Sequence, residues 1–427
     1  MAGALACAAS LLVLWVAPRA EAAWSAPLTI TQQHGVGGPL VAMDSFGNTV
    51  FAWAQVQDGS VQGATYTRSR LADGTLTPIQ RVTPPGETGS LQDLAVDPAG
   101  NAYFVWQVFD PSGYQIRARV RAADGTLRPV QTLANGNFDN GVGDASVGVG
   151  DNGRAVFSWL RANGDNPNLI QARSRSASGQ LGPVRTVARG SLPRMAVDAS
   201  GNATFAWRVH VDSGNGTPNT IWTRVLTSAG TLTEPARVSR VGHGAGDPRV
   251  GVSRQGRAVF EWDESDPDGS HPVLLVRGRA PDGSLRPPQL LAKTNSDNVD
   301  MAVSPNGAAV ACWIDGNFDL RERGRTVGGT LGPLRTVAAR ASNPGLCRPG
   351  IDSHGTVALA WTGSDGSKQR VYARSGPVDG ALGPVQTLSP AGFNARVSDL
   401  TVGADGTAPV GWTLGRNGFA LQAAFGP

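Results

Sequence analysis

Apolar and polar residues alternate along this chain in short runs, and the pattern returns about every fifty residues. In its clearest copy, residues 94–106, an apolar run enters a turn of sequence Asp-Pro-Ala-Gly-Asn, and a second apolar run ends at Trp106. Short alternating runs bounded by Gly, Asp and Asn predict β-strands joined by tight turns. The copies are marked by eight tryptophans, 48 to 55 residues apart: Trp53, Trp106, Trp159, Trp207, Trp262, Trp313, Trp361 and Trp412.

Each repeat predicts four strands, which we call A to D. Strand A precedes the turn, strand B ends at the Trp, strand C alternates as in residues 116–121, and strand D reads Pro-Val-Gln-Thr-Leu in residues 129–133. Four-stranded antiparallel units repeated along a chain are typical of a β-propeller with one blade per repeat. A Gly lies six residues before every Trp, where a tight A–B hairpin needs a positive φ: Gly47, Gly100, Gly153, Gly201, Gly256, Gly307, Gly355 and Gly406.

The two ends of the chain complement each other. Residues 24–31 resemble the end of a repeat, whereas the eighth repeat stops at Pro427 without its last strand. A ring must close, while an open solenoid would instead need polar capping repeats. We therefore predict an all-β, eight-bladed propeller of four-stranded antiparallel blades as a single domain over residues 24–427. Blade 8 would consist of about 396–427 completed by 24–32.

The A–B hairpin carries a resemblance to a known repeat. Its copy Val-Asp-Pro-Ala-Gly-Asn-Ala, residues 96–102, resembles the hairpins of NHL-type and related secreted bacterial propeller repeats. The resemblance covers about residues 24–427. It implies a binding scaffold, because those families are mostly scaffolds with a few enzymes among them, and it transfers no functional residue to this chain.

The N-terminal segment is expected to direct export. Residues 1–23 contain an apolar run over 4–17 and an Ala-x-Ala cleavage site at 20–22, although no basic residue precedes the run. This arrangement is typical of a secretory signal peptide, and the run is too short to span a bilayer comfortably. No other segment is a candidate for a membrane span. We expect a mature protein that is secreted, periplasmic or at the cell surface.

Charge excludes one class of partner. With 37 basic and 33 acidic residues the net charge is +4, and the basic residues are nearly all Arg, without clusters. A phosphate backbone requires a basic face, so we expect no nucleic-acid binding. We expect a monomer.

Strand alternation separates two faces of the disc. The A–B and C–D turns are short and uniform and lie at one end of every blade, which we call the stereotyped face. The B–C and D–A loops lie at the other end, the variable face, and differ in length and composition, as in 161–168, 209–218 and 263–271. Binding residues are usually carried on variable loops of a rigid scaffold. We therefore place any site on the variable face.

Some repeated polar residues are predicted to be structural. An Arg on strand C lies six residues before the Gly of the C–D turn, and we expect it at the height of the Trp, stacked on the indole. An Asp nine residues before the Trp is expected to accept N–H groups of the A–B turn. The residues are Arg68, Arg119, Arg173, Arg224, Arg277, Arg323 and Arg374, and Asp44, Asp97, Asp198 and Asp352.

The candidate site lies thirteen residues before each Trp, on strand A. Six of these eight channel-mouth positions are charged: Asp93, Arg194, Arg249, Asp300, Arg348 and Asp399. One interpretation is a ring of ion pairs between blades, such as Arg249 with Asp300 and Arg348 with Asp399. The other is a polar mouth that holds a ligand, in which Arg194 and Arg249 face an anionic group.

Further candidate side chains lie in variable-face loops. His210, His243, His271, Asp266 and Asp268 could support acid–base chemistry. Their spacing matches no metal-ligand pattern, and catalytic fingerprints such as GxSxG, the P-loop and HExxH are absent. We therefore expect no catalytic residue that can be named, no metal and no cofactor.

Two cysteines remain in the mature chain, Cys312 in repeat six and Cys347 at the start of repeat seven. An oxidising compartment would permit a disulfide between these neighbouring units. The sequence alone leaves this bridge and a pair of unrelated buried thiols both open.

Three functions remain open. The first is an exported, non-enzymatic scaffold that binds a protein or glycan through the variable face. The second is a carbohydrate-active hydrolase or lyase that uses carboxylates and His on that face. The third is a structural cell-surface protein without a specific ligand.

Overall fold

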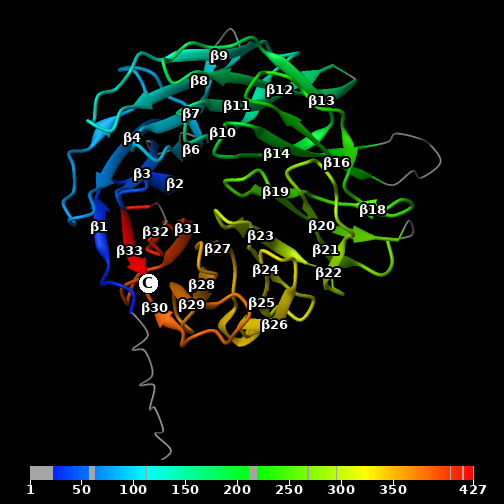
Figure 1. The fold of residues 1–427 in the computed structure, drawn as a ribbon. Helices are drawn as coiled ribbons and strands as arrows, with labels where there is room; N and C mark the ends of the chain where they lie inside the picture. Colours follow the sequence, from blue (N-terminus) through cyan, green and yellow to red (C-terminus); the bar gives the residue numbers. More distant parts are fainter. Residues whose placement is uncertain are drawn as a thin grey trace, which may run out of the picture.

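The structure is a computed structural model that describes residues 23–56, 63–110, 113–164, 166–210, 219–266, 269–294, 296–403, 405–415 and 418–426. Within these residues, eight antiparallel sheets stand around a central axis as the blades of a propeller (Figure 1). The fold class predicted from the sequence is confirmed.

Blades 1 to 4 have four strands each. They are β2(Val36–Met43), β3(Thr49–Val56), β4(Gly63–Arg70), β5(Gln80–Arg81); β6(Ser90–Val96), β7(Ala102–Asp110), β8(Gly113–Arg121), β9(Gln131–Gly136); β10(Val142–Val149), β11(Ala155–Asn163), β12(Asn166–Arg175), β13(Arg185–Arg189); and β14(Ser191–Val197), β15(Ala203–Val209), β16(Thr220–Leu226), β17(Ala236–Arg237).

Blade 5 has its strand A in two pieces, β18 and β19. Blades 5 to 8 are β18(Gly244–Ala245), β19(Arg249–Val252), β20(Ala258–Ser265), β21(Val273–Arg279), β22(Gln289–Ala292); β23(Asp297–Val303), β24(Ala309–Ile314), β25(Leu320–Arg325), β26(Leu331–Ala338); β27(Cys347–Ile351), β28(Thr356–Ser364), β29(Gln369–Pro377), β30(Gln386–Thr387); and β31(Ala395–Leu400), β32(Ala408–Leu414), β33(Ala420–Gly426), β1(Leu28–Thr31). A 3-10 turn, η1(Arg340–Ser342), connects blades 6 and 7.

The A–B turn is built as its sequence predicts. The eight turn glycines have φ between 73° and 99°, a region that L side chains rarely adopt. In blade 2, the Asp97 carboxylate accepts the backbone N–H groups of Ala99 (3.1 Å) and Asn101 (2.9 Å). The Asn101 side chain in turn accepts the N–H of Ala123 in the C–D turn (3.2 Å). Both turns of the blade therefore meet on the stereotyped face.

The core lies between blades rather than within them. Phe104 and Trp106 of blade 2 pack against Val50 and Ala52 of blade 1. Seven of the eight repeat tryptophans are less than 2% exposed, and Trp207 is 3% exposed. An indole that buries roughly 200 Å² contributes about 5 kcal/mol at ~25 cal/mol per Å² before entropy is subtracted. The tryptophans are framework residues, as expected.

The strand-C arginines do not stack on the tryptophans, so that prediction is wrong. Arg119 lies directly opposite Phe104, two residues before the Trp. Its Nε donates to the carbonyl of Arg128 in its own blade (2.7 Å), and its Nη1 donates to the carbonyl of Val82 in blade 1 (2.7 Å). The other six arginines make the same two kinds of bond: Arg68, Arg173, Arg224, Arg277, Arg323 and Arg374. Spacing from the turn glycines therefore identified the repeated arginines but not the groups that they contact.

The N-terminal strand closes the ring. β1 pairs with β33 as the outermost strand of blade 8, with Thr29 opposite Gln422. The Arg68 guanidinium donates to the carbonyl of Ile30 at 2.7 Å, just as the other arginines reach the preceding blade. At the seam between blades 7 and 8 the strand-C position is Ala424, opposite Val410.

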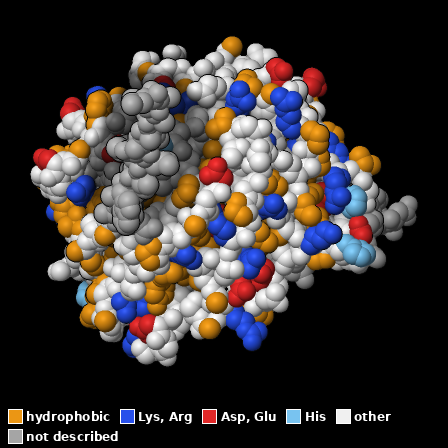
Figure 2. Space-filling model, turned by 60° about the horizontal axis from the view of Figure 1, so that its bottom comes forward, with side chains coloured by type: hydrophobic (Ala, Val, Ile, Leu, Met, Phe, Trp, Pro, Cys, Tyr) orange, Lys and Arg blue, Asp and Glu red, His pale blue; other side chains and the backbone are white. Residues whose placement is uncertain are grey.

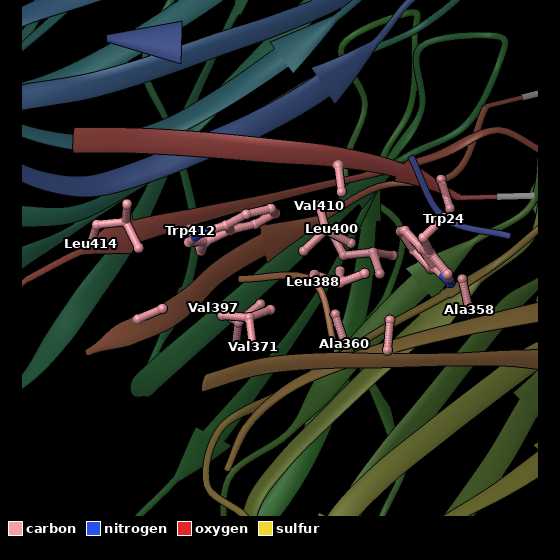
Figure 3. Packing of buried hydrophobic residues seen from close by; sticks show 14 of the residues in the cluster. Trp24, Ala358, Ala360, Val371, Leu388, Val397, Leu400, Val410, Trp412 and Leu414 are labelled. Carbon is pink, nitrogen blue, oxygen red and sulfur yellow. The ribbon is translucent and has the colours of Figure 1, made fainter. Parts of the chain in front are cut away.

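Trp24 occupies that seam. Its backbone N–H donates to Oε1 of Gln386 in blade 7 at 3.0 Å. Figure 3 shows Leu388 and Leu400 between Trp24 and Trp412 in one apolar cluster. At the seam between blades 7 and 8, the buried Trp24 side chain thus takes the place of the arginine–carbonyl hydrogen bonds of the other seams.

One seam is also covalent. Cys312 of β24 and Cys347 of β27 are joined by a disulfide with a Cα–Cα distance of 6.5 Å. Cys312 directly precedes the repeat Trp of blade 6, and its side chain points towards blade 7, opposite to that of the Trp. The bridge therefore links blades 6 and 7.

Replacing Arg277 by Ala should lower the free energy of unfolding by about 1.5–3 kcal/mol, because the backbone carbonyls of Arg286 and Val238 lose a charged donor. Chemical denaturation would measure the loss. Arg286→Ala is the matched control, because this arginine is exposed at the adjacent hairpin. Equal stability of the two variants would contradict the bridging role.

The double change Cys312→Ser/Cys347→Ser should lower stability by roughly 2–4 kcal/mol, since the bridge restricts the unfolded chain. A reductant should destabilise the wild type by a similar amount and leave the double variant unchanged. If the reductant also destabilised the double variant, the loss of stability in the wild type could not be assigned to the disulfide.

Candidate functional site

The channel-mouth positions lie within strand A, beside an irregularity in its pairing with strand B. In blade 2 the register shifts between Leu91 and Asp93, and five other blades shift at the same place. Four of the residues inside these bulges have φ near 50°: Gly38, Asp144, Leu192 and Asn298. A bulge redirects the neighbouring side chain. In blades 2 and 8 the channel-mouth residue reaches the next blade, whereas Ser146 of blade 3 bonds Ser158 of its own blade.

Two of the acidic residues accept backbone bonds from the following blade. Asp93 accepts the N–H of Val147 in blade 3 at 2.9 Å, and Asp399 accepts the N–H of Val41 in blade 1 at 2.8 Å. Burial raises the pKa of Asp93 to about 7 and that of Asp399 to about 6. These carboxyls connect blades and do not form the predicted ion pairs.

Asp300 shows why one ion pair does form. The residue equivalent to Val147 and Val41 in blade 7 is Pro349, which has no N–H to donate. The Asp300 carboxylate instead binds the Arg348 guanidinium, with Oδ2 and Nη1 2.8 Å apart. The Nε of Arg348 donates to the carbonyl of Ser398 in blade 8. Arg348 therefore pairs with Asp300, and the predicted pair with Asp399 is wrong.

Arg249 also has a different partner from the one predicted. Its Nη1 lies 3.3 Å from Oε2 of Glu261 on β20 rather than beside Asp300. The Glu261 side chain is buried, and its Oε1 has no hydrogen-bond partner among the described residues. Burial raises the pKa of Glu261 to about 8. Glu261 directly precedes a repeat Trp, where other copies have small or apolar residues, and this departure was a signal that the sequence analysis missed.

Arg194 and Arg249, the two arginines of the predicted anion site, have different partners. Arg249 is bound to Glu261, whereas Arg194 is exposed and donates to the carbonyl of Pro193 at 3.2 Å. The two arginines are engaged differently.

A large cavity opens at the other side of the channel mouth. It has a volume of about 1060 Å³ and is lined mainly by blades 1, 7 and 8. Of the described residues that line it, the charged ones are Arg348 and Arg396, and none is acidic. Arg396 is exposed, and its Nε donates to Oε1 of Gln369 at 3.2 Å. Much of the rim is glycine: Gly35, Gly37, Gly38, Gly345, Gly415 and Gly418.

A smaller cavity, of about 290 Å³, lies at the stereotyped face, where the ends of the A strands line it. Arg254 of blade 5 and Asp151 of blade 3 form an ion pair beside it, bypassing blade 4. The wider cavity on the variable face is therefore the better candidate site.

The histidines predicted on the variable face partly come together. His243 and His271 approach the two oxygens of Asp266 with their Nδ1 atoms, at 3.1 Å and 2.8 Å. Figure 2 shows His beside Arg and acidic side chains at the edge where Figure 1 places β18 and β20. His210 has a different partner, Oδ1 of Asn219, at 2.7 Å. Asp268 lies outside the described residues.

The Glu264 carboxylate, beside this cluster, is already hydrogen-bonded. It is buried, accepts Nε of Arg240 at 2.8 Å and accepts the Trp262 indole N–H at 2.6 Å. Among the described residues, no group of three or more His, Cys, Asp or Glu side chains is placed to hold a metal ion.

Comparison with known proteins shows the fold and no family. No protein-family profile matches the chain. No curated protein matches it.

Solved structures do match. They include the BP39L lectin from Burkholderia pseudomallei, with a TM-score of 0.54, 11% identity and coverage of 84% of this chain and 99% of that one. Sqt1 from Chaetomium thermophilum has a TM-score of 0.52, 13% identity and coverage of 92% and 97%. An ulvan lyase of polysaccharide lyase family PL25, bound to -[GlcA(1-4)Rha3S]-, has a TM-score of 0.50, 9% identity and coverage of 92% and 93%.

In the part of the chain that the structure describes, no helix has the length and apolar character needed to cross a bilayer.

The buried carboxyl of Glu261 should make stability depend on pH. Its pKa is raised from the ordinary value of 4.5 to about 8, so the folded state holds a proton that the unfolded chain has lost. The free energy of unfolding should therefore fall as pH rises between these values. Glu261→Gln should match the wild type near pH ~5 and exceed it by about 1–3 kcal/mol near pH ~9.

Denaturation at both pH values would check this. Glu234→Gln, at an exposed site, should keep the wild-type profile. A Glu261→Gln profile as steep as that of the wild type would contradict the assignment.

Proposed function

We propose that this protein is an exported, non-enzymatic binding protein that recognises an acidic glycan in the cavity on the variable face between blades 7, 8 and 1. The observation that supports this most is the lining of that cavity, whose described residues include two arginines and no acidic residue. Guanidinium groups suit carboxylate and sulfate groups, which they can bind with two parallel hydrogen bonds.

The glycine rim supports the same proposal. Without side chains at these positions, a ligand can approach the backbone closely, as at Gly37 and Gly345. Backbone carbonyls have two lone pairs and can accept a further hydrogen bond from a sugar hydroxyl. The rigid blades below hold these groups in place, which limits the entropy that is lost on binding.

The two arginines of the cavity differ in how far their charge is already neutralised. Arg348 is fixed by Asp300 and the Ser398 carbonyl. Its charge is therefore partly neutralised. Arg396 is exposed and held by the neutral amide of Gln369, so its charge is available to a ligand. Arg396 is the residue on which recognition of an acidic group would depend most.

The hydrolase or lyase alternative would use the cluster around Asp266. Each oxygen of that carboxylate already lies beside one histidine. The nearby Glu264 is bonded to Arg240 and Trp262. The supporting geometry is therefore weaker than at the cavity. Export itself rests on residues 1–23, of which 1–22 lie outside the described residues.

The test is retention on immobilised oligosaccharides. Fragments of alginate, polygalacturonate, hyaluronate and heparin should bind, and binding should weaken as salt is added. Arg396→Ala should weaken it about tenfold, or ~1.4 kcal/mol. Arg194→Ala, an exposed arginine at the opposite side of the mouth, should not change it.

Other outcomes would reject the proposal. Binding lost with Arg194→Ala but kept with Arg396→Ala would place the site elsewhere on the mouth. Shortened oligosaccharides would identify an enzyme. Retention of acidic peptides alone would identify a protein ligand, and no retention at all would favour a structural role.

A further inference from the structure

A second feature of the variable face lies at blades 2 and 3 and shares no lining residue with the cavity described above. Phe109 and Tyr114 form a cross-strand pair at the B–C end of blade 2. Phe138 joins them from the loop between β9 and β10. The ring centroids are 5.2 Å (Phe109–Tyr114), 6.0 Å (Phe109–Phe138) and 6.3 Å (Tyr114–Phe138) apart. We call these three rings the aromatic platform.

The platform is open to solvent. Phe138 is 62% exposed and Phe109 is 44% exposed, whereas the five repeat phenylalanines of the B strands are buried in the seams between blades: Phe51, Phe104, Phe157, Phe205 and Phe260. Leaving roughly 100 Å² of a ring in water forgoes about 2–3 kcal/mol of burial. Exposed apolar groups that lie together on a soluble protein mark a binding surface more often than isolated ones do.

The loop that carries Phe138 is held in shape. The Asn137 side chain accepts the N–H groups of Asp139 at 3.1 Å and Asn140 at 2.7 Å, which is the Asx-turn arrangement. Gly141 lies next to the Tyr114 ring, where a Cβ would come within 3.3 Å of a ring carbon. The absence of a side chain there lets the ring and the loop approach closely. The platform is therefore pre-organised.

Two clefts flank the platform, and Tyr114 lines both. One has a volume of about 540 Å³ and the other about 430 Å³. Each contains one charged residue, Arg161 in the first and Asp144 in the second. Arg161 is bonded to the carbonyl of Asn135 and to Oε1 of Gln171. The other polar side chains of the clefts are amides or the Tyr hydroxyl, and the amides are Gln92, Gln107, Gln115, Asn135, Asn137, Asn140 and Asn168.

From this combination we infer that the aromatic platform is a binding site for the pyranose rings of a neutral oligosaccharide. A pyranose has an apolar C–H face, which an aromatic ring can cover, and a rim of hydroxyls. Carboxamides both donate and accept hydrogen bonds, as hydroxyls require. The small and balanced charge of the clefts suits a neutral ligand rather than a phosphorylated or acidic one. A lipid surface would instead call for basic side chains around the rings.

The two clefts on either side of Tyr114 imply more than one sugar subsite. A chain of several residues could place one ring on the platform and continue into each cleft. This inference does not rest on the acidic-glycan site, because blades 7, 8 and 1 contribute nothing to the platform. It would make the variable face bivalent for glycans, with one neutral and one acidic subsite on separate blades.

Calorimetric titration of the full chain with cellohexaose, xylohexaose, mannohexaose and a β-galactan hexamer tests the inference. At least one of these neutral probes should bind saturably. Phe138→Ala should weaken that binding tenfold or more, Phe138→Leu should weaken it similarly because it lacks a ring face, and Phe138→Trp should retain it.

Two controls separate this site from others. Phe46 is 68% exposed on the stereotyped face, and Phe46→Ala should leave binding unchanged. Arg396→Ala should also leave it unchanged, so that failure of the acidic-glycan proposal would not affect this result. The inference is overturned if none of the four probes binds, if Phe138→Leu binds as well as the wild type, or if Phe46→Ala or Arg396→Ala weakens binding as much as Phe138→Ala.

Discussion

The ring depends on a guanidinium that bonds two carbonyls at once. Each strand-C arginine donates to a carbonyl that follows the C–D turn of its own blade and to one of the preceding blade, as Arg119 does with Arg128 and Val82. A planar guanidinium can do this because its N–H donors point in fixed, divergent directions, which a Lys ammonium cannot reproduce. Packing of the Phe and Trp side chains supplies most of the burial at each seam. The arginine sets the register at which one blade meets the next.

The repeat made the fold predictable, because each of its features acts within one hairpin. The positive φ at Gly100 and the N–H groups that Asp97 accepts follow from local turn chemistry. Blade number and closure followed from counting. Contacts between blades were predicted less well, since they depend on how two strands A are offset. Arg348 illustrates this, because it pairs with Asp300 where Pro349 offers no N–H. The missing N–H is informative only after Asp93 and Asp399 are seen to accept an N–H at the equivalent position.

The candidate sites lie where the repeats differ. Arg396, Gln369 and the glycine rim come from segments that diverge in each blade, so periodicity could not bring them together. The aromatic platform was missed for the same reason: Phe109, Tyr114 and Phe138 occupy no repeated position. Glu261 could have been found from the sequence, because it interrupts a column of small or apolar residues. The channel-mouth ring, in contrast, was prominent in the sequence and proved largely to connect blades.

The closing strand also bears on when the protein can fold. β1 pairs with β33, so Thr29 must find Gln422 at the far end of the chain, and Trp24 must settle into a cluster built from blades 7 and 8. Contacts this distant in sequence form slowly. Early blades can assemble as the ribosome releases them, but the first strand must wait for the last. Until β33 has formed, β1 lacks its partner strand and leaves an open sheet edge, which makes the unfinished ring the form most exposed to aggregation.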